Sequence, residues 1–291
     1  MFKRCFFNSL WISGVALSLA TGCGDDTGPS GEQGTITFTS WGEEYIEQEI
    51  PTDIFEDGYS IHYDKFLVLI SNITVADEEG TVAASDENAY LIDHTETGVK
   101  ELVKFEGLEA KSYTLVHYET SPAERSKIKL VGSATEADAD MMADKGYHVY
   151  IEGTLSKGGD SKTFKWGFGI PTLLDECEGE IDGKLTEGAV VTSGGDDVIE
   201  LTIHGDHFFY DDLQSPDAVV RGDAVFNADA DDDGEVTQAE LAAIPLVDLP
   251  ADQYGTGGVE GVNDLGAFVG FLSRTIGHYR GEGECFLKSP E

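Results

Sequence analysis

The chain has 291 residues, and its 56 acidic side chains outnumber its 18 basic ones, which gives a formal net charge of −38. Hydrophobic residues make up 40% of the sequence, enough to build a core, so a wholly disordered chain is excluded. Phosphate contacts require clustered Lys and Arg, so this composition excludes a nucleic-acid-binding protein. The charge suits a protein outside the cytoplasm or one that binds cations.

Residues 1–22 have the features of a secretory signal peptide. Lys3 and Arg4 lie near the start, and an apolar stretch that ends at Ala20 follows them. Small residues then precede Cys23, an arrangement that resembles a bacterial lipoprotein cleavage site, at which the cysteine becomes the lipidated N-terminus. The alternative is an ordinary signal peptide with an incidental cysteine. We expect a membrane anchor through a lipid on Cys23 and a flexible tether over residues 23–34.

Four cysteines are present, and two of them have other predicted fates. Cys5 lies in the predicted signal peptide and Cys23 carries the predicted lipid, which leaves Cys177 and Cys285. An oxidising compartment favours a disulfide between these two residues. The alternative is a pair of reduced cysteines.

Residues 35–205 are predicted to form a β domain. Segment 35–39 alternates β-branched and other residues, and 59–75 is a long run rich in Ile, Val, Tyr and Phe. Further strands are expected at 89–93, 99–105, 112–118, 146–155, 162–170 and 198–204, with one short helix at 134–144. Because no helices alternate with these strands, we expect a mainly β fold, an antiparallel sandwich or barrel-like domain.

Residues 206–291 show helical spacing instead. Helices are predicted at 217–228 and 238–244, and apolar residues recur every three or four positions through 261–279. We therefore expect a C-terminal helical appendage that packs on the β domain.

Residues 229–240 match the loop of the EF-hand calcium site. The alternative is a chance run of acid, but Gly234 at the sixth place and Val236 at the eighth also fit the motif. One loop is present, whereas calcium sensors pair two, so a structural role for Ca²⁺ is expected. The predicted ligands, in loop order, are Asp229, Asp231, Asp233, Glu235 through its backbone carbonyl, Thr237 and Glu240.

A second candidate metal site combines imidazole and carboxylate groups. His204, Asp206 and His207 follow a predicted strand, and His278 lies near the end of the last predicted helix. These side chains together suit Zn²⁺ or Cu²⁺. The alternative is that His204 ends a strand and His207 caps the aromatic run 208–210. Three more histidines, each beside a Tyr, are interpreted as partly buried and hydrogen-bonded: His62, His117 and His148.

No familiar catalytic motif is present, since the sequence lacks G-x-S-x-G, H-E-x-x-H, a phosphate loop and a dinucleotide fingerprint. The chain resembles a group of uncharacterised exported lipoproteins of Gram-negative bacteria. The resemblance rests on residues 23–26, 204–211, 229–240 and 277–285. It implies a lipid-anchored protein of the cell envelope, periplasmic or surface-facing, in which Cys177 and Cys285, and likewise the three histidines of the second site, belong together. It implies no activity.

These observations predict a non-enzymatic, calcium-binding lipoprotein outside the cytoplasm. The alternatives are a protein that binds Cu²⁺ or Zn²⁺ at the histidine site, or a hydrolase that uses a metal there to activate water. No protein partner is indicated by the sequence.

Overall fold

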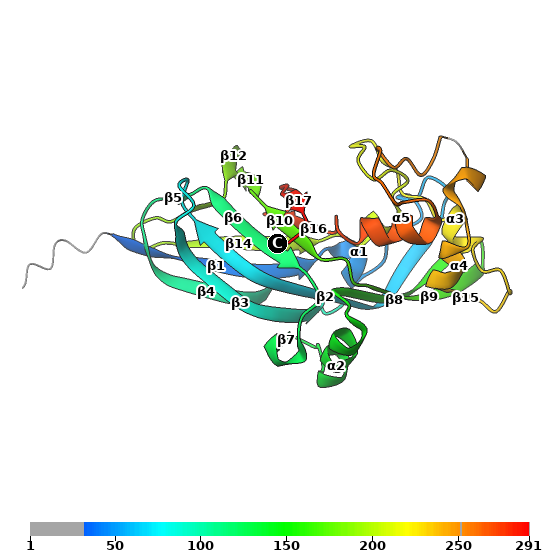
Figure 1. The fold of residues 1–291 in the computed structure, drawn as a ribbon, viewed down its shortest axis with the longest axis horizontal. Helices are drawn as coiled ribbons and strands as arrows, with labels where there is room; N and C mark the ends of the chain where they lie inside the picture. Colours follow the sequence, from blue (N-terminus) through cyan, green and yellow to red (C-terminus); the bar gives the residue numbers. More distant parts are fainter. Residues whose placement is uncertain (1–31, 251, 291) are drawn as a thin grey trace, which may run out of the picture. The chain divides into compact units, whose positions relative to one another are not determined.

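The computed structural model describes residues 32–250 and 252–290, and this part of the chain is mainly β, with curled sheets and five short α-helices (Figure 1). The predicted mainly β class is confirmed. The predicted signal peptide, Cys23 and most of the predicted tether lie outside the described residues. Among the residues that are described, no helix is long and apolar enough to cross a membrane.

A four-stranded sheet has the order β16-β14-β1-β4. β1 alternates Thr with Ile36 and Phe38, whose side chains are fully buried. It begins two residues before the predicted domain boundary, so the end of the predicted tether belongs to the sheet. β1 and β14 run parallel, which corrects the expectation of a purely antiparallel fold. The strands are β1 (Gln33–Gly42), β4 (Lys100–Glu109), β14 (Asp196–Ile203) and β16 (Gly277–Tyr279).

A nine-stranded sheet is built around the long strand β2. β8 and then β6 pair along one edge of β2, and β3 pairs along the other. The register shifts near Asn72, which has a φ of 51°. The strands are β2 (Ser60–Ala76), β3 (Val82–Asp93), β6 (Leu115–Thr120), β7 (Ile128–Val131), β8 (Val149–Lys157), β9 (Asp160–Phe168), β10 (Thr172–Asp175), β15 (Glu235–Val236) and β17 (Phe286–Lys288).

Two further two-stranded sheets complete the β structure of the described residues. They are β5 (Ser112–Tyr113) with β13 (Ala189–Val190), and β11 (Glu178–Ile181) with β12 (Lys184–Glu187).

The two large sheets share one hydrophobic core. Phe38 of β1, Leu201 of β14 and Phe66 of β2 all belong to it. Alternate residues of β2 point the other way: Leu67 and Leu69 pack in a second cluster with Met142. β2 is therefore buried on both faces, which explains its long apolar run.

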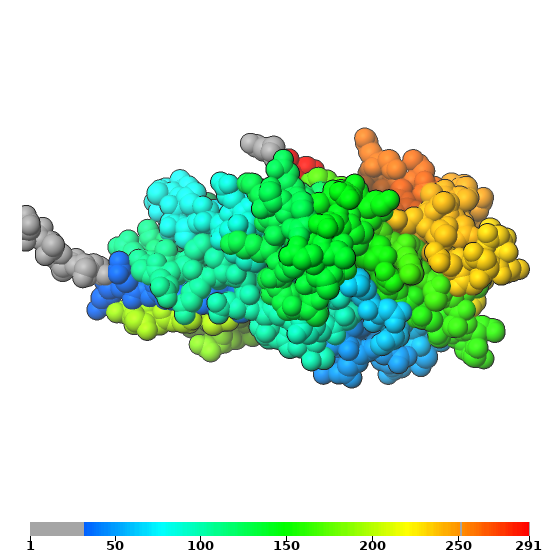
Figure 2. Space-filling view, turned by 90° about the horizontal axis from the view of Figure 1, so that it is seen from below, coloured from blue at the N-terminus to red at the C-terminus, as the bar shows by residue number. Residues whose placement is uncertain are grey.

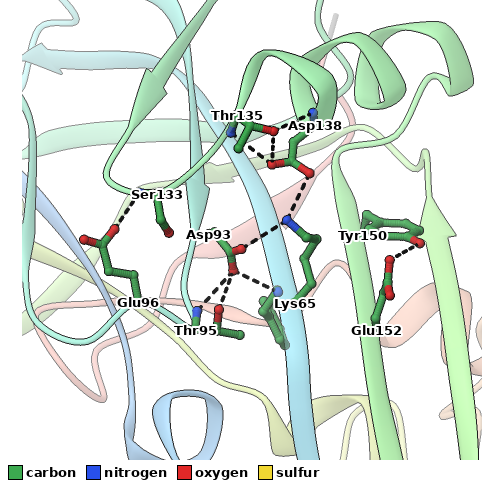
Figure 3. Close-up of polar contacts among 10 residues, drawn as sticks. Lys65, Asp93, Thr95, Glu96, Ser133, Thr135, Asp138, Tyr150 and Glu152 are labelled. Carbon is green, nitrogen blue, oxygen red and sulfur yellow. Dashed lines mark hydrogen bonds and ion pairs between the residues drawn. The ribbon is translucent and has the colours of Figure 1, made fainter.

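The outer face of β2 and β3 is covered by α2 (Glu136–Lys145), while β7 extends the sheet beside β3; both lie in the green region in the middle of Figure 2. Thr135 and Asp138 form a capping box that starts α2. Lys65 of β2 places its Nζ atom 3.0 Å from Asp138 Oδ1 and 3.4 Å from Asp93 Oδ2, so one ammonium group joins β2, β3 and α2 (Figure 3). The predicted helix at 134–144 is confirmed.

The predicted helix at 261–279 is wrong beyond α5 (Leu265–Leu272). Asp264 caps the first turn of α5 through the backbone N–H of Ala267. Residues Gly277–Tyr279 instead form β16, which pairs with β14. The apolar spacing continues past residue 272. Residues 277–279 nevertheless leave the helical conformation, because they form backbone hydrogen bonds with the edge of β14, and a longer helix would leave that edge unpaired.

A separate helical appendage is not confirmed. In the described part of 206–291 the other helices are short, and their buried residues, such as Val225 and Leu241, join the same core as the sheets. The remaining elements are α1 (Glu44–Glu47), η1 (Arg125–Lys127), η2 (Asp206–Phe209), α3 (Asp223–Phe226), α4 (Gln238–Ala242) and η3 (Leu246–Asp248).

The predicted disulfide between Cys177 and Cys285 is present. Cys177 follows β10 and Cys285 precedes β17, so the bridge joins residues 108 apart in the sequence. In the chain-entropy model, closing a loop of that length stabilises the folded state by about 4–5 kcal/mol, because it restricts the unfolded chain. Measured stabilisation is commonly smaller. The bridge therefore holds the C-terminal segment that carries β16 against the β domain.

Candidate metal centre

Three imidazoles meet where β14 ends. The ring centroid of His204 lies 4.3 Å from that of His278 and 5.3 Å from that of His207, and the last two rings are 5.1 Å apart. His204 is 6% exposed, His207 7% and His278 8%. The structure thus brings together the three histidines that the sequence analysis grouped.

The pairing of β14 with β16 places two of these rings. Ile203 lies opposite Gly277, and the backbone N–H of His204 donates to the carbonyl of Ile276 at 2.9 Å. His204 and His278 are then diagonal neighbours on one face of the ladder, close enough for rings to touch. His278 was predicted to lie on a helix, and this prediction is wrong. It lies on β16, and the pairing of β16 with β14 brings its ring against that of His204.

Gly205 allows the chain to turn and bring in Asp206 and His207. A Cβ atom at this position would lie 2.7 Å from Ile46 Cγ1 and 2.9 Å from Tyr63 Cε2, so only glycine fits without displacing them. The Tyr63 hydroxyl donates to the carbonyl of Gly205 at 2.6 Å. The following residues form η2, which starts at Asp206.

Hydrogen bonding favours one tautomer of His207. The Thr275 hydroxyl donates to the carbonyl of Leu272 at 2.9 Å, so its oxygen is free to accept from His207 Nδ1, 3.0 Å away. A proton on Nδ1 leaves the lone pair of Nε2 for a ligand. Thr275 thus orients His207 in the manner of the groups that support metal-binding histidines.

Two carboxylates adjoin the imidazoles. Asp206 accepts from the Tyr210 hydroxyl at 3.2 Å through Oδ2, and Glu43, just before α1, lies with Oε1 3.4 Å from His204 Nδ1. Burial, followed by repulsion from Asp206, raises the pKa of Glu43 to about 8. Burial also raises the pKa of Asp206.

Burial keeps the imidazoles of His204 and His207 neutral. It lowers the pKa of His204 to about 3, with a further contribution from His278. Burial likewise lowers the pKa of His207 well below its ordinary range, assisted by His278. Neutral imidazole is the form that binds a transition metal, so the site does not have to lose protons from these rings first.

Several ligand atoms of the centre are buried without a hydrogen-bond partner among the described residues: Glu43 Oε1, His204 Nε2, Asp206 Oδ1 and His278 Nδ1. Ligand atoms of His204, Asp206 and His207 lie within 4.8 Å of one another, and so do those of His204, His278 and Glu282. Imidazoles with carboxylates suit Zn²⁺ and Cu²⁺. The sequence analysis did not identify Glu43, Glu282 or Thr275, because no local motif connects them with the histidines.

Two pockets adjoin the cluster. One, of about 430 Å³, is lined by Glu43, His204, Asp206 and Glu282 among others. The other, of about 490 Å³, is lined by His207 and His278. Tyr210 borders both pockets.

The acidic loop at 229–240 is folded around part of its predicted ligand set. Ligand atoms of Asp229, Asp231 and Glu240 lie within 4.8 Å of one another. Asp233 accepts from the backbone N–H of Glu235 at 2.8 Å, and Thr237 donates its hydroxyl to Glu240 at 2.8 Å. Thr237 and Glu240 also form the capping box that starts α4, so each side chain accepts a hydrogen bond from the backbone of the other residue.

Strand β9 lies beside this loop where a second loop would lie in a calcium sensor. β15 pairs in parallel with β9, and Trp166 donates from Nε1 to the carbonyl of Val236 at 2.8 Å. Lys162 of β9 places its Nζ atom 3.0 Å from Asp229 Oδ2. This hydrogen bond lowers the pKa of Asp229, and the lysine brings one positive charge to the first predicted ligand.

The other histidines lie outside the cluster. His62 is exposed, contrary to expectation, although its Nδ1 lies 2.9 Å from the carbonyl of Gln48. His117 is partly buried, with its Nδ1 3.7 Å from Asp175 Oδ1. His148 is fully buried, and its Nε2 lies 3.5 Å from the carbonyl of Ser273.

Comparisons of the chain with protein-family models, with curated proteins and with solved structures found no match.

Glu43 gives the metal-free protein a pH-dependent stability. Its pKa is raised from 4.5 to about 8 in the folded chain, so its contribution is fully present below about pH 4.5 and is lost as the pH rises through 8. Glu43→Gln, which imitates the protonated form, should stabilise the protein relative to wild type at pH 8 more than at pH 5. We expect a difference on the order of 1–3 kcal/mol after allowance for solvent screening, measured by denaturant unfolding in excess EDTA.

The matched control is Glu44→Gln, at the exposed neighbouring position. Its effect should change little between the two pH values. An equal effect of Glu43→Gln at pH 5 and pH 8 would contradict a raised pKa.

Proposed function

We propose that the protein binds a transition-metal ion at the cluster of His204, His207 and His278 with Asp206. The observation that carries this proposal is the set of buried ligand atoms without a hydrogen-bond partner among the described residues, namely His204 Nε2, Asp206 Oδ1 and His278 Nδ1. A buried polar atom left unpaired costs about 1–3 kcal/mol. One cation can satisfy several such atoms at once.

The donor set decides which cations are suitable. Three imidazoles favour Zn²⁺ or Cu²⁺ over Ca²⁺ or Mg²⁺, which prefer oxygen ligands. Thr275 supports this role because it fixes His207 with Nε2 free. Bound there, an ion supplies a Lewis acid beside two pockets. The function proposed is binding, and hydrolysis stays an alternative that turnover of a substrate would reveal.

A second proposed function is calcium binding by the EF-hand-type loop at 229–240. The specific observation in its favour is the approach of Asp229, Asp231 and Glu240, which hold the first, third and twelfth places of the motif. The ion would have a structural role, because the loop connects α3 to α4 and pairs with β9. The positive charge of Lys162 beside Asp229 opposes tight binding.

The proposed cellular location is the envelope of a Gram-negative bacterium, with the chain anchored by a lipid on Cys23. The sequence around Cys23 supports this proposal.

Transition-metal binding is tested with the untagged full-length protein by isothermal titration with Zn²⁺ and with Cu²⁺. His204→Ala should lower the affinity for either ion at least 10-fold, because this side chain contacts both neighbouring rings. His62→Ala is the matched control, an exposed histidine outside the cluster, and should leave the affinity unchanged. Equal affinity of His204→Ala and wild type would refute the site.

Calcium binding is tested by thermal unfolding, first with excess EDTA and then with millimolar Ca²⁺. At ten times the dissociation constant, Ca²⁺ adds about 1.4 kcal/mol, which corresponds to a rise in Tm of roughly 3 °C. Glu240→Gln should abolish the rise. If wild type shows no rise, or the variant shows the same one, the loop does not stabilise the protein by binding Ca²⁺ under these conditions.

Anchoring is tested by growth of producing cells with a labelled fatty acid. The wild-type chain should incorporate the label and Cys23→Ser should not, since the acceptor cysteine is absent. Label in the variant, or none in the wild type, argues against a lipid on Cys23.

A further inference from the structure

The residues around the centre fall into two groups that share one member. His204, Asp206 and His207 form the first group, and His204, His278 and Glu282 form the second. We propose that the centre holds two transition-metal ions, one in each group, with His204 lying between them. This inference rests on the proposed transition-metal binding and deepens it.

Bond lengths argue for two positions. Zn²⁺ binds nitrogen and oxygen ligands at about 2.0–2.2 Å, so two ligands of one ion are at most about 4.4 Å apart. The ligand atoms of each group lie within 4.8 Å of one another, so a small inward shift of the side chains brings each group to this scale. At that separation the five residues make two groups of three and not one group of five. As they are placed, a single ion reaches only one group.

The shared residue is suited to its position. His204 is 6% exposed, its Nε2 has no hydrogen-bond partner among the described residues, and its Nδ1 faces Glu43 at 3.4 Å. Imidazole has two ring nitrogens on different edges, and a neutral ring offers one lone pair, so His204 would bind both ions as imidazolate, with its remaining ring proton released to solvent. Each group also contains another buried atom without a partner, Asp206 Oδ1 in the first and His278 Nδ1 in the second.

Backbone geometry places Glu282 in the second group. After β16 the chain turns back, and the backbone N–H of Tyr279 donates to the carbonyl of Gly283 at 2.8 Å. Arg280 anchors this turn, with Nη2 2.7 Å from Asp197 Oδ2. The turn therefore holds Glu282 near the ring of His278.

Charge is the second argument. The carboxyl groups of Glu43, Asp206 and Glu282 line one pocket together with His204. Each group contributes one carboxyl group, Asp206 in the first and Glu282 in the second, and a divalent ion bound there would favour its ionised form. Both pockets also reach the cluster, so ions can enter from either side.

The experiment counts ions. Untagged full-length protein is equilibrated with Zn²⁺ in excess Ca²⁺, which occupies the acidic loop, then separated from free metal and analysed by elemental mass spectrometry. Wild type should retain two zinc ions per chain. Asp206→Asn and Glu282→Gln should each retain one, their double variant none, and His204→Ala none. His62→Ala should retain two, and far-ultraviolet circular dichroism checks that every variant is folded.

The two proposals fail in different ways. One zinc ion per wild-type chain, reduced equally by Asp206→Asn and Glu282→Gln, would overturn the two-ion centre and leave metal binding standing. No zinc in the folded wild type would overturn both. Two ions that persist in the folded double variant would place them elsewhere and also overturn the inference.

Discussion

The antiparallel pairing of β14 with β16 is the constraint on which the candidate centre depends. It brings residue 278 beside residue 204. Three interactions hold β16 in place: the hydrogen bond from His204 to Ile276, the ion pair of Arg280 with Asp197, and the disulfide of Cys285. The C-terminal segment is thus part of the β domain and completes the centre.

The centre gathers polar groups at a place where burial is unfavourable to them. The same burial that keeps His204 and His207 neutral leaves His204 Nε2 and His278 Nδ1 without a hydrogen-bond partner among the described residues and raises the pKa of the neighbouring Glu43. Such an arrangement destabilises the folded protein without a metal, and a cation bound there would relieve that destabilisation. The acidic loop differs, because Lys162 and backbone N–H groups already satisfy part of its charge.

The sequence was sufficient for features that depend on local pattern or on counting. Alternation and composition predicted the mainly β class, the two remaining cysteines predicted the disulfide, and the short helix expected at 134–144 is α2. The spacing of His204 and His207 at the end of a strand also indicated one of the groups.

Features that depend on sheet topology were not predictable in this way. The parallel pairing of β1 with β14 joins residues about 160 positions apart, and it brings Glu43 to the end of β14. Helical periodicity in 261–279 gave no sign that an edge of β14 was free to pair with its last residues. Glu282 stands on a turn that exists only because β16 forms. Each failure has the same cause, which is that a contact between distant strands overrides a local preference.

The central claim is that imidazoles of the β14–β16 junction bind a transition metal. The most direct measurement is X-ray absorption at the zinc edge of the untagged full-length protein loaded with zinc in excess Ca²⁺. The account predicts scattering from imidazole ligands at about 2.0–2.1 Å, reduced in a folded His278→Ala variant. A shell of oxygen ligands alone, or an unchanged spectrum in that variant, would contradict it.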